Sequence, residues 1–421
     1  MNKYKRIVLS NKAPIITVPV SGAKTTTALM VFKTGSRYET RKNSGISHFL
    51  EHMFFKGTKN RPDTLMISSA LDALGCEFNA FTSKEYTGYW VKAAENKLVE
   101  ALDVLGDMIL NSKFDKEEIE REKGVIIEEL NMYEDNPMMH IEDVLERCLF
   151  GDTPAGWDTI GTKENIENFA RQDFMSYFHS QYGAKSAILV LAGGVKDRDI
   201  KKGREIMNKL GVNKWKKQVK NVYKQTRPQI KMSFKDTDQA NISLAVRTFP
   251  IGHAEELNAK LLAVILGGAM SSRLFINLRE RNGLAYYVKT DTEFYTDSGY
   301  LSTQAGVPTA KVSKAIEIIL VEYARLKEEL VSEEELTRAK DLLQGRMFLQ
   351  MEASDNLANW YARQAVLRGQ LSSPEEFLKK IKKVSATDLR QTAKKIFVNA
   401  GLNLAGIGRF KEAELKKILK F

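Results

Sequence analysis

The stretch GYWVKAAENKLVEALDVLGDMI, residues 88–109, reappears in altered form as GYLSTQAGVPTAKVSKAIEIIL, residues 299–320. Both stretches are typical of a strand that opens on Gly and an aromatic residue, a polar turn, and an amphipathic helix. A second repeated segment follows directly, because residues 114–136 resemble residues 331–356. Two repeated segments in the same order predict that the chain contains two copies of one domain.

Short β-rich runs alternate with long amphipathic stretches in both copies. Residues 25–32 (TTTALMVF) are typical of a strand, whereas residues 45–55 are typical of a helix. We therefore expect an α+β fold with two homologous domains, each an antiparallel sheet packed by helices. A polar, lysine-rich stretch marks the join between them, which gives a first domain, a linker and a second domain at residues 1–215, 216–232 and 233–421.

Length and composition limit the class of protein. The chain has 421 residues, of which 43% are hydrophobic, so it can fill two domain cores and is too apolar for a disordered chain. Its two cysteines provide no disulfide framework, which favours a reducing compartment. No stretch reads as a signal peptide or a membrane span, so we expect a cytoplasmic protein with no membrane partner.

The formal net charge of +11 suggests a different class of function, a basic protein that binds nucleic acid. The 64 Lys and Arg residues are spread along the chain among 53 Asp and Glu residues. That distribution is typical of a solvated surface, and no motif for binding RNA or DNA accompanies it. We expect no nucleic-acid partner, and polyanion binding with a steep salt dependence and no metal would favour the alternative.

Two of the five histidines lie together in GISHFLEHMFF, residues 45–55. On a helix, His48 and His52 are one turn apart and project from one face, so that two imidazoles can bind one cation. Glu51 lies on an adjacent part of that face, from which its carboxylate can reach a metal-bound water. This HxxEH arrangement is typical of sites where Zn²⁺ lowers the pKa of water to about 7 and a carboxylate takes the proton.

A hydrolytic zinc site of this kind needs a third protein ligand and leaves the fourth position for water. A carboxylate is the usual partner of two histidines. The acidic helix that we expect after Asp115 offers several carboxylates between Glu117 and Glu134, and the residues alone leave the choice among them open.

From residue 45 to residue 136 the sequence resembles the inverzincin metallopeptidases of the pitrilysin family, M16. The likeness is strongest to the two-domain branch that includes the β subunit of mitochondrial processing peptidase. That family has HxxEH followed, on a second helix, by a Glu in a V-I-x-x-E context. The resemblance implies that His48, His52 and Glu129 bind zinc, with Glu129 preferred to the adjacent Glu128. Glu122 matches a second acidic position, which would orient a ligand histidine through its other ring nitrogen; the alternative is a solvated carboxylate.

The second copy lacks these metal ligands. When the repeats are aligned, Arg346 stands opposite Glu129 and Ala339 stands opposite Glu122. The apolar run at residues 261–266 stands opposite the two histidines. The second domain therefore cannot bind zinc in this way, and the resemblance implies that it shapes the substrate cavity instead.

The resemblance also implies residues that bind substrate. Asn79, Ala80 and Phe81 match the family's strand beside the zinc site, to which an extended peptide adds as a further strand. The alternative is a plain edge strand. In the second half, a Gly-rich turn and an R-x6-Y spacing select Arg279 and Tyr286, which would bind the substrate carbonyl and stabilise the oxyanion. Their alternative interpretation is a surface arginine and a core tyrosine.

The sequence therefore predicts a zinc-dependent peptidase that hydrolyses peptides or unfolded segments inside a closed chamber. Glu51 would be the general base and then the proton donor to the leaving amine. The resemblance implies a chamber of four such domains, so two chains must pair. We expect a homodimer, because this chain keeps both the metal set and the Arg279 and Tyr286 pair, which would face the partner's zinc site. The alternative within the family is a non-catalytic subunit of a complex, although such chains typically lose the ligands.

Overall fold

The computed structural model describes residues 4–421, which form two compact units. Each unit is assembled from several segments of the chain. Unit 1 combines the chain up to Asn131 with Asp158–Val219 and Met347–Glu375. Unit 2 combines Met132–Trp157, Lys220–Arg346 and Glu376–Phe421.

Unit 1 contains a six-stranded sheet in the order β1-β2-β6-β3-β5-β4, which leaves β4 at an edge. Its strands are β1 (Lys5–Val8), β2 (Pro14–Pro19), β3 (Thr25–Phe32), β4 (Glu77–Thr82), β5 (Thr87–Ala94) and β6 (Ala187–Gly193). Neighbouring strands are antiparallel except β2 and β6, which are parallel. The helices of this unit are α1 (Ile46–Met53), α2 (Thr64–Asp72), α3 (Leu98–Asn111), α6 (Lys163–Asn168), α7 (Arg171–Gln181), α8 (Asp197–Asn208) and α12 (Ser354–Leu367).

Unit 2 contains a five-stranded sheet in the order β7-β11-β8-β10-β9. Its strands are β7 (Gln229–Ser233), β8 (Gln239–Arg247), β9 (Tyr287–Phe294), β10 (Gly299–Pro308) and β11 (Leu402–Ile407). Its helices are α5 (Pro137–Phe150), α9 (Glu256–Gly267), α10 (Val312–Glu328), α13 (Pro374–Lys383), α14 (Ala386–Ile396), α15 (Glu412–Ile418) and the π-helix η3 (Phe275–Glu280). Two long helices, α4 (Lys116–Asp135) and α11 (Glu333–Met351), each run from one unit into the other. No helix within residues 4–421 has the length and apolar character to cross a membrane.

The two sheets repeat one topology. Strands β7, β11, β8, β10 and β9 follow the same order as β2, β6, β3, β5 and β4, and the parallel pair β7/β11 matches the parallel pair β2/β6. The expected α+β fold, with two homologous sheet domains packed by helices, is confirmed. Each sheet is mixed rather than wholly antiparallel, because its one parallel pair joins an early strand to the last strand of the unit.

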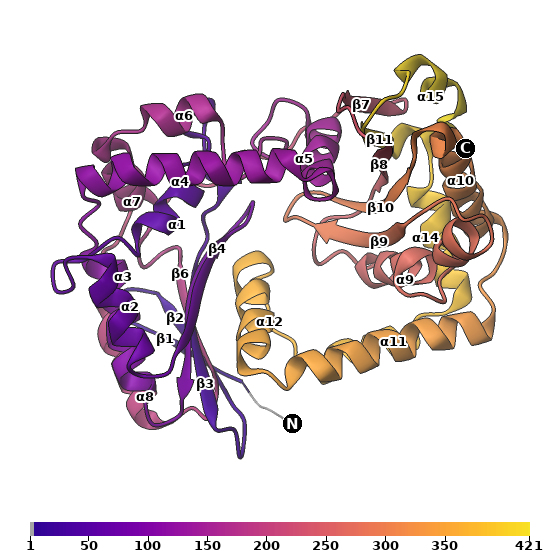
Figure 1. Cartoon of the computed structure of the whole chain (residues 1–421). Helices are drawn as coiled ribbons and strands as arrows, with labels where there is room; N and C mark the ends of the chain where they lie inside the picture. The colour runs from indigo at the N-terminus through magenta and orange to yellow at the C-terminus, as the bar shows by residue number, and fades with distance from the viewer. Residues whose placement is uncertain (1–3) are drawn as a thin grey trace. The chain divides into compact units, whose positions relative to one another are not determined.

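Each sheet is covered on one face by a helix from the other repeat (Figure 1). Helix α12, late in the chain, packs on β2, β3 and β6 of unit 1, and Leu357 and Tyr361 are buried there. Helix α5, from the first repeat, packs on β7, β8 and β11 of unit 2, where Leu145 is buried. The division of the sequence at residues 1–215, 216–232 and 233–421 stays a prediction, and each compact unit combines segments from both sides of it.

The polar stretch between the repeats contains no helix or strand until β7 begins at Gln229. Its first part is nevertheless attached to unit 1. The Trp215 indole Nε1 donates a hydrogen bond to the Lys33 carbonyl oxygen (2.7 Å), and the Gln218 amide donates one to Glu85 (2.8 Å). These contacts make the first part of the linker a packed component of unit 1.

Because α5 and α12 each pack on the sheet of the other repeat, a substitution in one repeat should loosen the sheet of the other. We expect Leu357→Ala to speed hydrogen exchange of the β6 amides, and Leu145→Ala to speed that of the β11 amides. Removing a buried leucine side chain costs about 2–5 kcal/mol. Peptide-resolved hydrogen exchange mass spectrometry measures both effects. If Leu357→Ala sped hydrogen exchange only in unit 2, the packing of α12 on the sheet of unit 1 would be contradicted.

Candidate metal centre

Helix α1 begins at a backbone position that requires glycine. Gly45 precedes the helix with φ of 99°, in the left-handed region that other residues rarely adopt. A Cβ atom at this position would lie 2.5 Å from the Ile160 carbonyl oxygen and 2.9 Å from the Gly161 Cα. This close approach sets the direction in which α1 leaves the loop, and hence where His48 and His52 point.

A buried carboxyl group holds the first turn of α1. Glu39 accepts hydrogen bonds from the backbone N–H groups of Gly45 and Ser47, both at 2.8 Å. The first N–H groups of a helix have no partner within it, so these bonds satisfy donors that would otherwise be buried and unpaired. Burial raises the pKa of Glu39 to about 8. The Ser47 hydroxyl lies 2.8 Å from the Tyr177 hydroxyl, which anchors the same turn to α7.

His48, His52 and Glu129 converge on one point. Their ligand atoms all lie within 4.8 Å of one another. His48 Nε2 is 3.7 Å from Glu129 Oε1, and His52 Nε2 is 3.4 Å from Glu129 Oε2. These distances exceed an ordinary hydrogen bond. They match the separation of roughly 3.4 Å that tetrahedral angles and metal–ligand bonds of about 2.0–2.1 Å impose on two zinc ligands.

Helix α4 supplies the third member of this cluster. Its buried face carries Ile119, Glu122, Ile126 and Leu130. Glu129 lies two turns after Glu122, and its carboxylate reaches the histidines from this side of the helix. Glu128 is exposed. The period of the helix thus separates two adjacent glutamates that the sequence pattern alone leaves as alternatives.

Glu122 holds His52 in place. Its Oε1 lies 2.9 Å from His52 Nδ1, and its Oε2 lies 2.6 Å from the Lys56 ammonium. Burial opposes ionisation of this carboxyl, but the bonds to His52 and Lys56 outweigh burial and lower its pKa. With Nδ1 engaged by Glu122, the Nε2 of His52 faces Glu129. The sequence predicts this arrangement for Glu122, including the contact with the other ring nitrogen.

The donor set fits a zinc ion. Burial, and then the neighbouring His52, lower the pKa of His48 to about 4, whereas burial of His52 is outweighed by the bonds to Glu122 and Glu129, which raise its pKa to about 9. His48 is therefore neutral, and a cation that binds here displaces the proton between His52 and Glu129. The buried Nδ1 of His48 has no hydrogen-bond partner among the described residues. Two imidazoles and one carboxylate are a known ligand set for catalytic zinc. Within residues 4–421, no other group of histidines, cysteines and carboxylates is arranged to hold a metal ion.

Glu51 lies beside this cluster without belonging to it. Its Oε2 accepts a hydrogen bond of 2.6 Å from the Thr82 hydroxyl at the end of β4. Burial raises the pKa of Glu51, and the Thr82 bond and the nearby His52 oppose that rise. The carboxyl group is therefore partly buried and held by one defined donor, an arrangement that suits a group that must accept and return a proton.

The predicted substrate strand is the edge strand β4, next to α1. Side chains alternate along it, so Ala80 and Thr82 share the face that packs on α1, and Asn79 and Phe81 point to the opposite face. Phe81 packs against the core that includes α12, and its ring occupies the space over Gly88. The Asn79 side-chain oxygen accepts a hydrogen bond from the Ala80 N–H (2.8 Å). The side chains of the three predicted residues thus point to different faces, so only their main-chain groups lie along one edge of β4.

Comparisons with known proteins assign the chain to a family. The family model described as Insulinase (Peptidase family M16) matches residues 15–163, and that of the Peptidase M16 inactive domain matches residues 168–343. A Bacillus subtilis protein named uncharacterized zinc protease YmxG is 33% identical over 393 residues, covering 93% of each chain. The chain belongs to peptidase family M16. The resemblance inferred from sequence is confirmed.

Solved structures share the M16 fold at lower sequence identity. A protease from Helicobacter pylori matches with a TM-score of 0.90 and 22% identity, covering 97% of this chain and 100% of that one. A chain of complex III2 from Candida albicans matches with a TM-score of 0.84 and 19% identity, covering 99% and 100%. These likenesses concern the fold, which therefore occurs both in a protease and in a chain of complex III2.

The M16 inactive-domain half carries Arg279 and Tyr286. Arg279 belongs to the π-helix η3, its side chain is 46% exposed, and its guanidinium lies 5.0 Å from the centre of the Phe275 ring. Tyr286 is 75% exposed and is bound through its backbone N–H to the Gly306 carbonyl oxygen (3.0 Å). Tyr286 is therefore not a core residue. Exposure leaves both polar ends available to a ligand.

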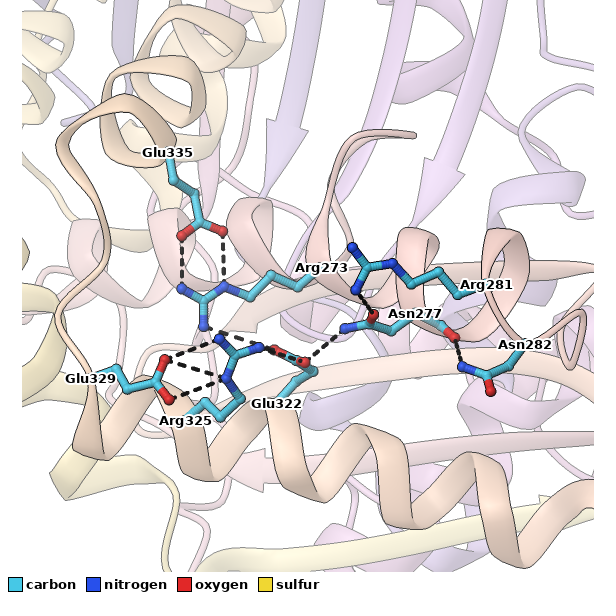
Figure 2. Close-up of polar contacts among 8 residues, drawn as sticks. All are labelled: Arg273, Asn277, Arg281, Asn282, Glu322, Arg325, Glu329 and Glu335. Atoms are coloured by element: carbon cyan, nitrogen blue, oxygen red, sulfur yellow. Dashed lines mark hydrogen bonds and ion pairs between the residues drawn. The ribbon is translucent and has the colours of Figure 1, made fainter.

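A network of charged and polar side chains around the buried Glu322 supports η3 (Figure 2). The Asn277 side chain, from η3 itself, donates a hydrogen bond of 2.7 Å to Glu322, and Arg325 donates one of 3.1 Å to the same carboxylate. Arg273, just before η3, pairs with Glu335 of α11 through two bonds of 2.8 and 2.7 Å. The sequence alone does not indicate this network, because it joins segments that are far apart in the chain and carry no motif.

Matched substitutions on α4 test the ligand set. We expect Glu129→Gln to abolish tight zinc binding, because the site loses its only anionic ligand. Glu122→Gln should weaken binding by about 10- to 100-fold, since it no longer orients His52 as a carboxylate. Glu128→Gln should bind zinc like the wild type. Competition with a chromophoric chelator measures all three affinities, and equal loss in Glu128→Gln and Glu129→Gln would contradict the assignment.

Proposed function

We propose that this M16 chain is a zinc-dependent peptidase that hydrolyses peptides or unfolded polypeptide segments with metal-activated water. The observation that carries the proposal is the convergence of His48, His52 and Glu129, with the Glu51 carboxyl beside them. Two imidazoles and one carboxylate leave a fourth zinc position open for water, which is the arrangement of a hydrolytic rather than a structural site. The name zinc protease of the Bacillus subtilis relative supports the same activity.

The chain's own residues have separate tasks in this proposal. His48, His52 and Glu129 would hold zinc, which acts as a Lewis acid toward water and the scissile carbonyl. Glu51 takes a proton from the attacking water and returns it to the leaving amine nitrogen. The main chain at Asn79, Ala80 and Phe81 pairs with an extended peptide as an added strand, because β4 is an edge strand.

Arg279 and Tyr286 complete the proposed reaction by donating hydrogen bonds to the carbonyl oxygen as negative charge develops on it. Both donors are exposed on unit 2. The resemblance stated above implies that they act on the zinc site of a second copy, so we propose a homodimer that encloses a chamber. A cytoplasmic location belongs to the same proposal and is supported by the two free cysteines, Cys76 and Cys148.

A non-catalytic role in a complex is the second candidate, because a chain of complex III2 has the same fold. In such a role neither the third ligand nor the general base would be needed. This chain keeps all three metal-binding side chains in one cluster and Glu51 next to it. That retention favours the peptidase.

Glu51→Gln tests the activity. The variant should bind zinc as the wild type does, because Glu51 is not in the ligand cluster, and should lose peptidase activity by at least about 100-fold. Digestion of a peptide library, read by mass spectrometry with and without a chelator, measures activity, and metal analysis measures zinc content. A Glu51→Gln variant as active as the wild type would exclude the proposed mechanism.

Mixing two inactive variants tests the homodimer. If Arg279 serves the partner's zinc site, a mixed dimer of Glu51→Gln and Arg279→Ala chains contains one complete site. After subunit exchange, half of the dimers are mixed, so activity should return to at most about one quarter of wild type. Absence of any recovery, with exchange shown by native mass spectrometry, would place Arg279 outside the partner's site.

A further inference from the structure

Thr82 connects the proposed substrate strand to the proposed general base. It is the last residue of β4, and its Oγ1 donates a hydrogen bond of 2.6 Å to Glu51 Oε2. The same hydroxyl lies 3.5 Å from the Ser47 carbonyl oxygen, a much weaker contact. Its stronger interaction is therefore with Glu51.

The Thr82 hydroxyl is held rigidly. Thr82 pairs with Thr87 across β4 and β5, in the last pair before the strands turn. The turn is closed by Ser83, whose N–H and hydroxyl both donate to the Tyr86 carbonyl oxygen at 2.9 and 2.8 Å. A β-branched side chain in a strand also has few allowed χ1 rotamers. The donor that faces Glu51 thus has little freedom to move.

We propose that Thr82 is a positioning residue, which holds the Glu51 carboxyl in the orientation that proton transfer needs. The terminal torsion of a glutamate is broad, so the carboxyl group of Glu51 has no fixed plane without a donor. Thr82 engages Oε2 and leaves Oε1 to face the attacking water. This inference rests on the proposed role of Glu51 as general base.

The position of Thr82 gives this hydrogen bond a further consequence. A peptide that adds to the free edge of β4 pairs with the strand that ends in Thr82. The hydroxyl therefore ties the position of the base to the position of the bound main chain. Misplacement of a reacting group by about 1 Å is enough to cost roughly 100-fold in rate.

Thr82→Val tests the inference, because valine keeps the shape of threonine and removes the donor. We expect kcat for a fluorogenic peptide to fall by about 10- to 100-fold, with KM changed by less than about twofold. Thr82→Ser, which keeps the hydroxyl, should restore kcat to within about threefold of wild type. Zinc content should equal that of the wild type in both. If Thr82→Val does not fold, Thr82→Ala removes the same donor.

Thr87→Val is the matched control. Thr87 lies directly opposite Thr82 and is buried where Thr82 is partly buried, and its hydroxyl donates to the Thr34 carbonyl oxygen (2.8 Å) rather than to Glu51. Thr87→Val should lower the melting temperature and leave kcat unchanged. An equal loss of kcat in Thr87→Val and Thr82→Val would show a general effect of weakening the hairpin, and would overturn the inference.

A double substitution shows whether Thr82 acts through Glu51. In a Glu51→Asp background the shorter carboxylate cannot meet Thr82, so adding Thr82→Val should cost no more than about twofold in kcat. Additive losses would overturn the inference, as would a Thr82→Val variant that raises KM and keeps kcat. A different result, a fully active Glu51→Gln variant, would overturn the proposed function. An inactive Glu51→Gln with a fully active Thr82→Val would overturn only the role of Thr82.

Discussion

The candidate metal centre depends on one buried carboxylate between two helices. Glu122 is nearly inaccessible to solvent, and it is ionised because the His52 ring and the Lys56 ammonium, both near the end of α1, bind its two oxygens. Burying such a charge without partners would cost several kcal/mol, so these two contacts favour the observed register of α4 against α1. In that register Glu129, two turns along, comes to 3.4–3.7 Å from both histidines.

Other contacts keep α1 where this register needs it. Glu39 holds its first turn through Gly45 and Ser47, and Thr82 reaches it from β4. The supports come from a loop, a helix and an edge strand, so the histidines and Glu51 are held from several directions. The outer face of the same sheet is closed by α12, from the second repeat. Unit 1 is therefore incomplete until the chain has been made beyond Leu367.

Much of this could be predicted from the sequence. The repeat, the α+β fold, the spacing of His48, Glu51 and His52, and the choice of Glu129 all follow local periodicities or a family motif that spans two helices. Thr82 and Glu322 could not be identified in this way, because the residues that they contact lie far from them in the chain and are brought near only by the fold. The packing of α5 and α12 on the sheet of the other repeat leaves no local signal either, because an amphipathic helix has the same sequence pattern whichever sheet it covers.

The sequence by itself determined which residues can do the chemistry, because residue type and spacing along a helix decide which side chains share a face. It also determined that only the first repeat carries the His48, His52 and Glu129 set that could hold a metal ion. Tertiary structure decided which side chain meets which: Glu129 reaches the histidines while Glu128 stays in solvent, Thr82 donates to Glu51 while Phe81 turns into a core, and Tyr286 lies exposed. The physical reason is that these choices depend on the packing of segments distant in the chain, where burial and hydrogen bonding act between residues that no local pattern connects.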